Sequence, residues 1–232
     1  MTRSVTFVLW VWLGALGVLG VLGASADDGA YPSELARWQA KLAGNPKDIG
    51  ALVALGKLCH NRGTLDVPDA ADAVELARKY LGQALEIDPK HAFARALHGS
   101  TTVLTAKQAW LPTTKISRVR KGIAEMDAAL KDSPEDPDAR FTRASNNLFL
   151  PDLFDRKAVV TTDFAWLQER VDQGKFDAEF RQYVCLFHGR AKSKFGDKPE
   201  AERLWRAGIA IDPASKVAEE SRRALDPGRP NR

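Results

Sequence analysis

One unit of sequence recurs along this chain: an amphipathic helical stretch, a short corner that contains proline, and a second helical stretch. The stretch from Tyr80 to Gly99, YLGQALEIDPKHAFARALHG, carries a clear example with its corner at Asp88-Pro89. Similar corners occur at Asn45-Pro46, Ser133-Pro134 and Asp212-Pro213. Because proline cannot continue a helix, each corner separates two helices. The pattern predicts a stack of helical hairpins, and such stacks usually bind other macromolecules.

The composition is that of a folded protein, with 28% charged and 44% hydrophobic residues. The formal net charge is only +4 at pH 7, and both signs alternate along the helices, so no nucleic-acid partner is expected. The two cysteines, Cys59 and Cys185, lie far apart in apolar helical stretches. We expect both to be buried, reduced thiols, and a disulfide is the alternative.

Residues 1–26 differ in composition from the rest of the chain. Arg3 precedes an uncharged apolar run, Phe7–Gly23, and Ala24–Ala26 offers a small-x-small cleavage pattern. We therefore expect a signal peptide that is cleaved after Ala26, and an exported protein of the periplasm or cell envelope. The apolar run approaches membrane-spanning length, so an uncleaved anchor is the alternative. Membrane association is expected only in that case.

Helical periodicity continues through the rest of the chain without an alternating β pattern, which predicts an all-α domain over residues 27–226 and a flexible tail over 227–232. Gly63 is expected to end a helix in the left-handed conformation. Asp136-Pro137 should start one, and Asp197 with Glu200 fits a capping box. The expected helices cover 31–44, 47–63, 69–87, 91–110, a segment ending near 131, 136–150, a segment around 160–174, 177–195, a segment starting at 197, and 214–225.

The final unit carries Gly189, Ala201, Trp205, Gly208 and Pro213 at intervals that resemble the tetratricopeptide repeat (TPR). Two earlier units repeat parts of this pattern but are nine and eleven residues longer than the family standard; their matching positions are Ala77, Leu81, Ala84 and Pro89, and then Gly99, Met126, Ala129 and Pro134. The resemblance covers most of residues 31–226. It implies an α-solenoid of TPR-like helical hairpins wound into a right-handed superhelix. Small residues at these positions would let paired helices touch.

The segment from Trp110 to Leu167 also looks like exported bacterial repeat proteins of unknown function, which implies no particular activity. The TPR resemblance further implies a concave groove lined by the first helix of each unit. Such a groove suits an extended peptide or a partner helix. The residues expected to face it are Lys57, His60, Asn61, Phe93, Ser100, Phe141, Ser145, Tyr183 and Arg190.

The sequence offers no recognisable catalytic constellation. The four histidines, His60, His91, His98 and His188, have no zinc-ligand spacing, and no phosphate-binding loop or nucleophile elbow is present. We expect a protein without catalytic residues, cofactor or metal. His98 and His188 each precede the small glycine of a first helix and are expected to be partly buried and hydrogen-bonded within their repeats. Their alternative role is pH sensing or ligand contact.

Two further segments allow alternatives. The basic cluster Lys115, Arg118, Arg120 and Lys121 beside Trp110 is expected to be the water-facing side of a helix, and contact with acidic polymer or phospholipid headgroups is the alternative. The apolar segment 146–154, NNLFLPDLF, is expected to plug into the core or groove of the array. Its alternative role is an apolar patch that receives a partner.

Together these features favour a scaffold that binds a protein or peptide in its groove. The alternative function is a small-molecule or glycan-binding module that uses Trp110, Phe141 and Tyr183 as stacking surfaces. An enzyme would need a cleft with coupled carboxylates or histidines, and the sequence shows no sign of one.

Overall fold

The structure is a computed structural model, and it describes residues 30–226. Within this range the chain forms α-helices, two short 3-10 helices and no strand, which confirms the predicted all-α fold. The expected signal peptide and the tail at 227–232 lie outside the described residues. Of the helices that the structure describes, none is long and apolar enough to cross a membrane.

The chain divides into two compact units, Met1–Pro151 and Asp152–Arg232, and the boundary falls inside the predicted repeat domain. The first unit contains α2 (Ala30–Gly44), α3 (Ile49–Thr64), α4 (Ala70–Ile87), α5 (Ala92–Leu104), η2 (Thr105–Gln108), α6 (Pro112–Asp132) and α7 (Pro137–Leu148). The second contains η3 (Asp152–Phe154), α8 (Lys157–Asp172), α9 (Ala178–Lys194), α10 (Lys198–Ile211) and α11 (Lys216–Leu225).

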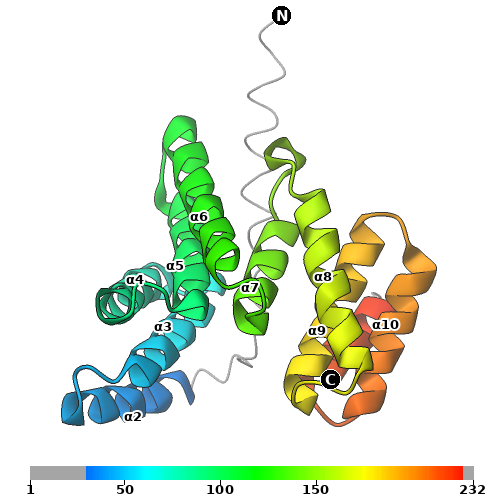
Figure 1. The fold of residues 1–232 in the computed structure, drawn as a ribbon, viewed down its shortest axis with the longest axis horizontal. Coiled ribbons are helices and arrows are strands. Elements are labelled where there is room, and N and C mark those ends of the chain that lie inside the picture. Colours follow the sequence, from blue (N-terminus) through cyan, green and yellow to red (C-terminus); the bar gives the residue numbers. More distant parts are fainter. Residues whose placement is uncertain (1–29, 227–232) are drawn as a thin grey trace, which may run out of the picture. The chain divides into compact units, whose positions relative to one another are not determined.

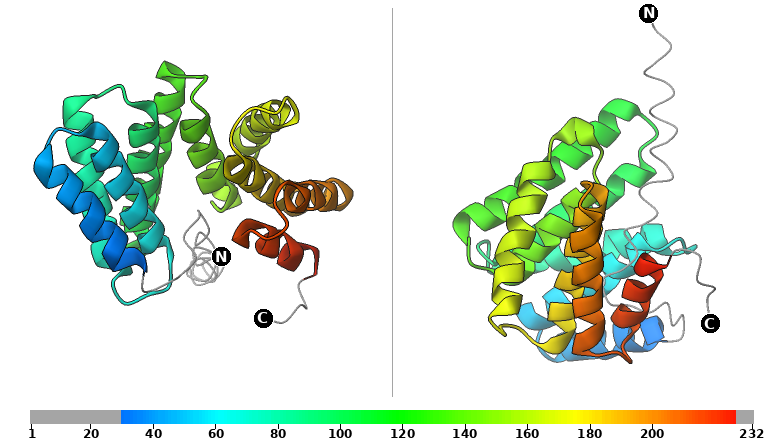
Figure 2. Two further views of the ribbon diagram at one scale, coloured as in Figure 1. Left: turned by 90° about the horizontal axis from the view of Figure 1, so that it is seen from below. Right: turned by 90° about the vertical axis from the view of Figure 1, so that its right-hand side faces the viewer.

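In the first unit two antiparallel hairpins, α3 with α4 and α5 with α6, pack side by side (Figures 1 and 2). Helix α2 covers α3 at one end, and α7 packs against α5 and α6 at the other. The core of the first hairpin is built on Leu52, Leu55 and Leu81, and the amphipathic α2 lays Trp38 against it. Each hairpin therefore buries one apolar face of each helix, as the periodicity predicts.

Helices α5 and α6 approach most closely at two glycines that face each other. A Cβ atom added to Gly99 would lie 2.7 Å from the carbonyl oxygen of Gly122, and a Cβ atom on Gly122 would collide with the carbonyl oxygen of Gly99. Gly122 stands twelve residues before Pro134, as Ala201 does before Pro213. The prediction that small residues let paired helices touch is thus confirmed, and Gly122 belongs to the same set.

Helix starts mostly follow the sequence signals. The Asp136 carboxylate accepts a hydrogen bond from the Ala139 N–H at 2.8 Å, so the predicted cap of α7 is confirmed. At α10 only half of the predicted capping box forms. Asp197 accepts from the Glu200 N–H at 3.4 Å, but the Glu200 carboxylate binds Arg203 at 2.7 Å and 2.8 Å.

The prediction that Gly63 ends a helix in the left-handed conformation is wrong. Helix α3 continues to Thr64, and Gly63 is a helical residue beside α4, where an added Cβ atom would lie 2.5 Å from a methyl group of Val74. Close approach of α4, and not a turn, requires glycine at this position. The left-handed conformation is instead adopted by Gly174, with φ of 71°, and Gly196, with φ of 96°.

The predicted helix over 91–110 is shorter in the structure. Helix α5 ends at Leu104 and tightens into η2, so Trp110 lies outside any helix. Polar contacts explain the change: the Thr105 hydroxyl donates to the Thr102 carbonyl at 2.7 Å, and the Arg118 guanidinium donates to the Thr105 carbonyl at 2.6 Å. These bonds satisfy carbonyls that the helix no longer uses.

The second unit is organised around the α9–α10 hairpin, with α8 beside α9 and α11 against both hairpin helices. Trp205 donates its indole N–H to the Leu186 carbonyl at 3.1 Å, and Gln182 donates to the Gly208 carbonyl at 2.9 Å. The final, best-matching repeat is therefore a closely packed pair. Cys185 of this unit and Cys59 of the first are both buried and free, as predicted.

Candidate functional site

A row of buried polar side chains connects α3, α5 and α7 in the first unit. His60 lies 3.0 Å from the Thr101 hydroxyl through Nδ1 and 3.5 Å from the Ser100 hydroxyl through Nε2. Asn146 donates from Nδ2 to the Ser100 hydroxyl at 2.9 Å. His60 and Asn146 are each only 3% exposed. The three first helices of this unit are thus tied together by side-chain hydrogen bonds as well as by apolar packing.

The donors and acceptors of this row fit a neutral His60. The Thr101 hydroxyl donates to the Leu97 carbonyl at 2.7 Å, so it must accept from the His60 Nδ1–H. The Ser100 hydroxyl accepts from Asn146 and can donate its own proton to His60 Nε2. A second proton on His60 would leave the Ser100 proton without this acceptor. The hydrogen bonds of this row therefore favour a neutral His60 that carries its proton on Nδ1.

Burial and a nearby positive charge also favour the neutral form of His60. Burial lowers the pKa of His60 to about 4 because the imidazolium would lose its hydration, and the nearby positive charge of Lys107 lowers the pKa further. The pKa of Lys107 is itself lowered by its partial burial. His60 is consequently neutral at physiological pH.

The structure places the predicted groove residues of the first unit in different surroundings. It brings His60 and Ser100 together, with the buried Asn61 next to His60 on α3. Phe141 and Ser145 lie one turn apart on α7, where the Ser145 hydroxyl donates to the Phe141 carbonyl at 2.7 Å. The remaining two are more accessible: Lys57 is exposed on α3, and Phe93 is partly buried against the core of the first hairpin.

The two predicted groove residues of the second unit lie on α9. Arg190 donates to the Glu220 carboxylate of α11 at 3.0 Å, and its guanidinium carbon lies 4.8 Å from the centre of the Phe187 ring. Burial lowers the pKa of Arg190 and raises that of Glu220, while their mutual attraction opposes both shifts. Tyr183 is partly buried, and its pKa is raised, first by burial and then by Glu179. Arg190 thus joins α9 to α11.

His98 and His188 each contact a side chain of a neighbouring helix. His98 of α5 lies 2.7 Å from the Glu125 carboxylate of α6, within its own hairpin. His188 of α9 stacks on Phe164 of α8 with a centroid distance of 5.7 Å, and its Nδ1 lies 3.4 Å from the Gln168 side-chain oxygen. Burial lowers the pKa of His188 to about 4, with a smaller effect from Lys192. His98 is partly buried and bonded within its own repeat, as expected, whereas His188 is buried and its partner Gln168 lies on α8, outside the final α9–α10 repeat.

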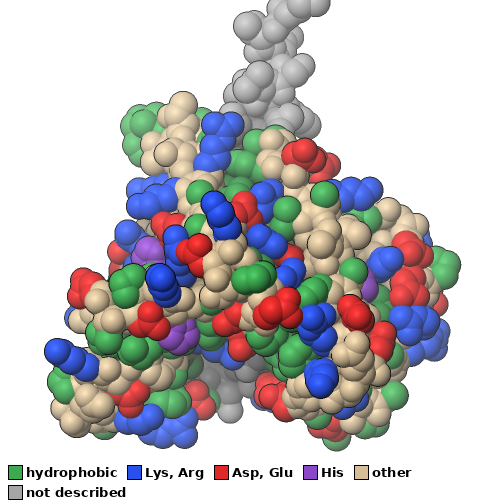
Figure 3. All heavy atoms as spheres, viewed as in Figure 1, with side chains coloured by type: hydrophobic (Ala, Val, Ile, Leu, Met, Phe, Trp, Pro, Cys, Tyr) green, Lys and Arg blue, Asp and Glu red, His purple; other side chains and the backbone are tan. Residues whose placement is uncertain are grey.

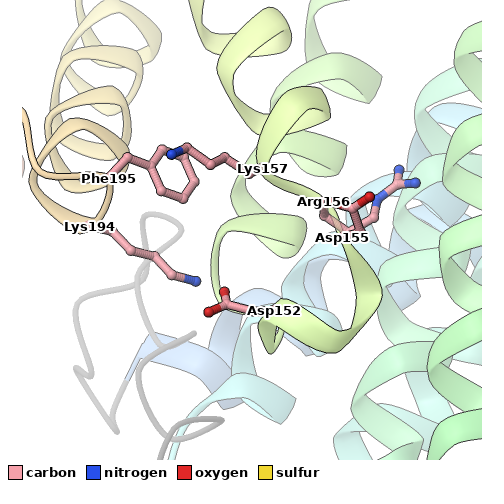
Figure 4. A pocket seen from close by; sticks show the side chains of 6 residues that line it. All are labelled: Asp152, Asp155, Arg156, Lys157, Lys194 and Phe195. Carbon is pink, nitrogen blue, oxygen red and sulfur yellow. The ribbon is translucent and has the colours of Figure 1, made fainter.

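A shallow pocket of about 380 Å³ lies in the second unit between the start of α8 and the end of α9 (Figure 4). Lys157 lies 5.2 Å from the centre of the Phe195 ring, and Lys194 extends toward Asp152. The other lining residues are Asp155 and Arg156. Opposite charges are mixed here. In the described residues, no group of three or more His, Cys, Asp or Glu side chains is arranged to hold a metal ion.

Sequence reasoning missed Thr101 and Asn146, which complete the polar row with His60 and Ser100. A signal was present: asparagine is a poor helix former, yet Asn146 and Asn147 stand together near the end of a helical stretch. Such residues persist in a helix where their side chains have a partner. Oδ1 of Asn146 has no hydrogen-bond partner within the part of the chain that the structure describes.

The apolar segment 146–154 is partly internal. Leu148 and Leu150 are buried at the end of the first unit, which agrees with the expected plug, whereas Leu153, in the 3-10 helix that opens the second unit, is exposed.

The four residues of the basic cluster differ in their exposure to solvent. Arg120 and Lys121 are exposed, while Lys115 and Arg118 are partly buried.

Comparison with known proteins gives a likeness of fold to a solved structure. No family model matches the chain, and no curated protein matches its sequence. The fold is similar to the crystal structure of a thermophilic TPR protein from Thermus thermophilus, with a TM-score of 0.65 and 15% sequence identity over 85% of this chain and 91% of that chain. Identity this low is informative about the fold alone. The chain accordingly has a TPR-like, all-α helical repeat fold.

Proposed function

We propose that this chain is a non-catalytic scaffold of the cell envelope, which binds a peptide or a partner helix on the α3–α5–α7 face of the first unit. The observation that carries the proposal is the hydrogen-bonded row His60–Ser100–Asn146, which fixes three successive first helices side by side. Helical repeats present their first helices as a continuous surface, and such a surface suits an extended polypeptide.

The chemistry of this face supports a polypeptide ligand. Lys57 provides an exposed positive charge on α3, and Phe93 a partly exposed ring on α5. Between them the buried row supplies rigidity, which lowers the entropic cost of binding because the surface is already ordered.

The absence of catalysis is part of the proposal and is supported by the contacts of the histidines. His60, His98 and His188 each hold a packing or hydrogen-bonding position between helices. A general base needs a pKa near the working pH and access to substrate. His60 and His188 are buried, with pKa values of about 4, and meet neither condition.

The envelope location rests on the sequence. Arg3, the apolar run Phe7–Gly23 and the small residues Ala24–Ala26 form the pattern of an export signal. An exported scaffold would meet its partner in the periplasm or at the cell surface. The partner is a polypeptide of that compartment.

Affinity capture from an envelope extract tests this function with a matched pair of variants, Lys57→Glu on the proposed face and Lys79→Glu on α4. Both lysines are exposed, so neither change should disturb the fold. We expect the wild-type protein and Lys79→Glu to enrich the same polypeptide, and Lys57→Glu to retain roughly tenfold less, since reversing an interfacial charge costs affinity. Failure to enrich any polypeptide, or equal retention by both variants, would contradict the proposal.

The same preparation distinguishes a small-molecule or glycan ligand. A compound that binds the folded state raises the melting temperature by mass action. The wild-type protein should show no such increase across a panel of metabolites and oligosaccharides. Phe141 is buried, so the variants that report stacking are those of the two more accessible aromatic residues. A reproducible increase that is lost in Trp110→Ala or Tyr183→Ala would favour the stacking alternative.

A further inference from the structure

The turn that joins η2 to α6 exposes an aromatic side chain to an unusual degree. Trp110 is 84% exposed and Leu111 is 41% exposed, although the preceding Ala109 is only 7% exposed. Large aromatic side chains normally bury most of their area in the fold or at an interface. An exposed pair of apolar side chains at the end of a hairpin indicates a site that contacts another surface.

The turn is held in place by its surroundings. The Ala109 N–H donates to the Ala106 carbonyl at 3.3 Å, and Arg118 of α6 binds the Thr105 carbonyl at 2.6 Å. Pro112 occupies the first turn of α6, where its ring fixes the backbone. Trp110 is therefore presented by an ordered corner. Figure 1 shows this corner at one end of the α5–α6 pair, and η2, which precedes it, contacts α4.

The charges of the chain segment that forms the corner are all positive, and Asp66 is an acidic residue from outside it that interacts with Lys107 of η2. No aspartate or glutamate occurs from Pro89 to Ala124, and this stretch contains Lys115, Arg120 and Lys121 on the first half of α6. The next acidic residue, Glu125, is bound to His98. Helix α6 also begins without an acidic residue or a side-chain cap, so the positive end of its dipole adds to the field. Hydrophobic and basic side chains lie over this end in Figure 3.

We propose that the α5–α6 tip, defined as Trp110, Leu111, Lys115, Arg120 and Lys121, docks on the surface of an anionic lipid bilayer. The indole ring suits the headgroup level of a membrane, where its apolar body and its N–H group are both accommodated. Lysines and arginines beside it are attracted to phosphate groups of anionic lipids.

The expected affinity of the tip for the bilayer follows from the number of basic and apolar side chains that it presents. Each lysine or arginine near an anionic surface contributes roughly a fivefold gain in partitioning, so three of them give about a hundredfold. One tryptophan and one leucine add a modest apolar contribution. The tip therefore holds the protein reversibly and orients it on the membrane, with or without the leader.

A fluorescent label at the tip tests this proposal in the full-length protein. Leu111→Cys provides one accessible thiol for an environment-sensitive dye, because Cys59 and Cys185 are buried and burial raises their pKa values. The matched control is Ala71→Cys, an exposed position on α4. With vesicles of phosphatidylcholine that contain phosphatidylglycerol, we expect a blue shift and quenching by lipid-borne nitroxides at position 111 and no change at position 71.

Charge dependence separates the tip from the leader. Adding Arg120→Gln and Lys121→Gln to the labelled protein should weaken the tip response roughly thirtyfold, and vesicles of pure phosphatidylcholine should give little response. High salt should also suppress it. A blue shift that is equal with and without these cations would mean that the leader alone brings the chain to the bilayer. That result, no shift on anionic vesicles, or binding of heparin in place of vesicles would overturn the proposal.

Discussion

Replacing Gly122 by alanine is expected to lower the free energy of unfolding of the first unit by about 3 kcal/mol. The added Cβ atom would collide with the carbonyl oxygen of Gly99, and a Cβ atom on Gly99 would meet Gly122 in the same way. Both obstructing atoms belong to helix backbone, so no side-chain rotation can relieve the contact. Helices α5 and α6 would have to separate along their length. Urea unfolding followed by hydrogen exchange over α5 and α6 measures the loss.

Gly82→Ala is the matched control for this prediction. Gly82 lies in the interior of α4, and an added Cβ atom there meets nothing within 4 Å. Alanine should therefore stabilise the unit by about 0.5–1 kcal/mol, because it favours the helix over the unfolded chain. Opposite signs for the two substitutions are the expected result. A neutral or stabilising Gly122→Ala would show that the two helices are not in backbone contact.

Acid is expected to destabilise both units between pH 6.5 and pH 4. His60 and His188 have folded pKa values of about 4, whereas an unfolded histidine titrates near 6.5. Over this interval the unfolded chain binds more protons than the folded one, so the free energy of unfolding falls as the pH falls. The stability is complete above pH 6.5, and each histidine accounts for a loss of about 2–3 kcal/mol at pH 4.5.

Single replacements assign this effect to each unit. In His60→Gln the first unit should lose most of its pH dependence above pH 4.5 while the second keeps its own. In His188→Gln the second unit should lose its acid destabilisation and keep only the opposite contribution of Glu220, whose pKa is raised by burial. Carboxylates with lowered pKa values, such as those of Asp48 and Asp69, titrate mainly below this interval. Hydrogen exchange at pH 7 and pH 4.5 resolves the two units. An unchanged slope in either variant would mean that the imidazole is not the titrating group.

Helix content and pairing could be predicted from the sequence because they depend on local signals. The apolar periodicity located the hairpins, and the cap at Asp136 follows from short-range geometry. The small residues Gly99 and Ala201 also predicted close contacts between paired helices. These features depend on a few neighbouring residues, and the structure confirms the all-α repeat fold that they predict.

Features that depend on residues distant in the sequence could not be predicted in this way. Gly63 has the sequence signature of a helix end, and only the position of Val74 on the next helix shows that its role is close packing. The early end of α5 depends on Arg118, which reaches back thirteen residues to the Thr105 carbonyl. The row through His60 likewise needs Asn146, supplied by a helix far along the chain.

The candidate site was predicted less fully than the fold for the same reason. The TPR resemblance indicates which positions of a first helix face inward, but not how neighbouring side chains fill the space. His60 and Ser100 meet because Thr101 and Asn146 complete their hydrogen bonds. Lys57 remains exposed because no neighbouring helix covers that side of α3 in the part of the chain that the structure describes.

Site-specific photo-crosslinking in living cells tests whether a polypeptide binds on the α3–α5–α7 face. A benzophenone amino acid is placed at position 57 on α3, and at position 79 on α4 as a control, in the full-length protein; both positions are exposed. We expect a crosslink to a discrete polypeptide from position 57 and none from position 79. Crosslinks from position 79 alone, equal crosslinks from both positions, or none from either would contradict binding on the α3–α5–α7 face.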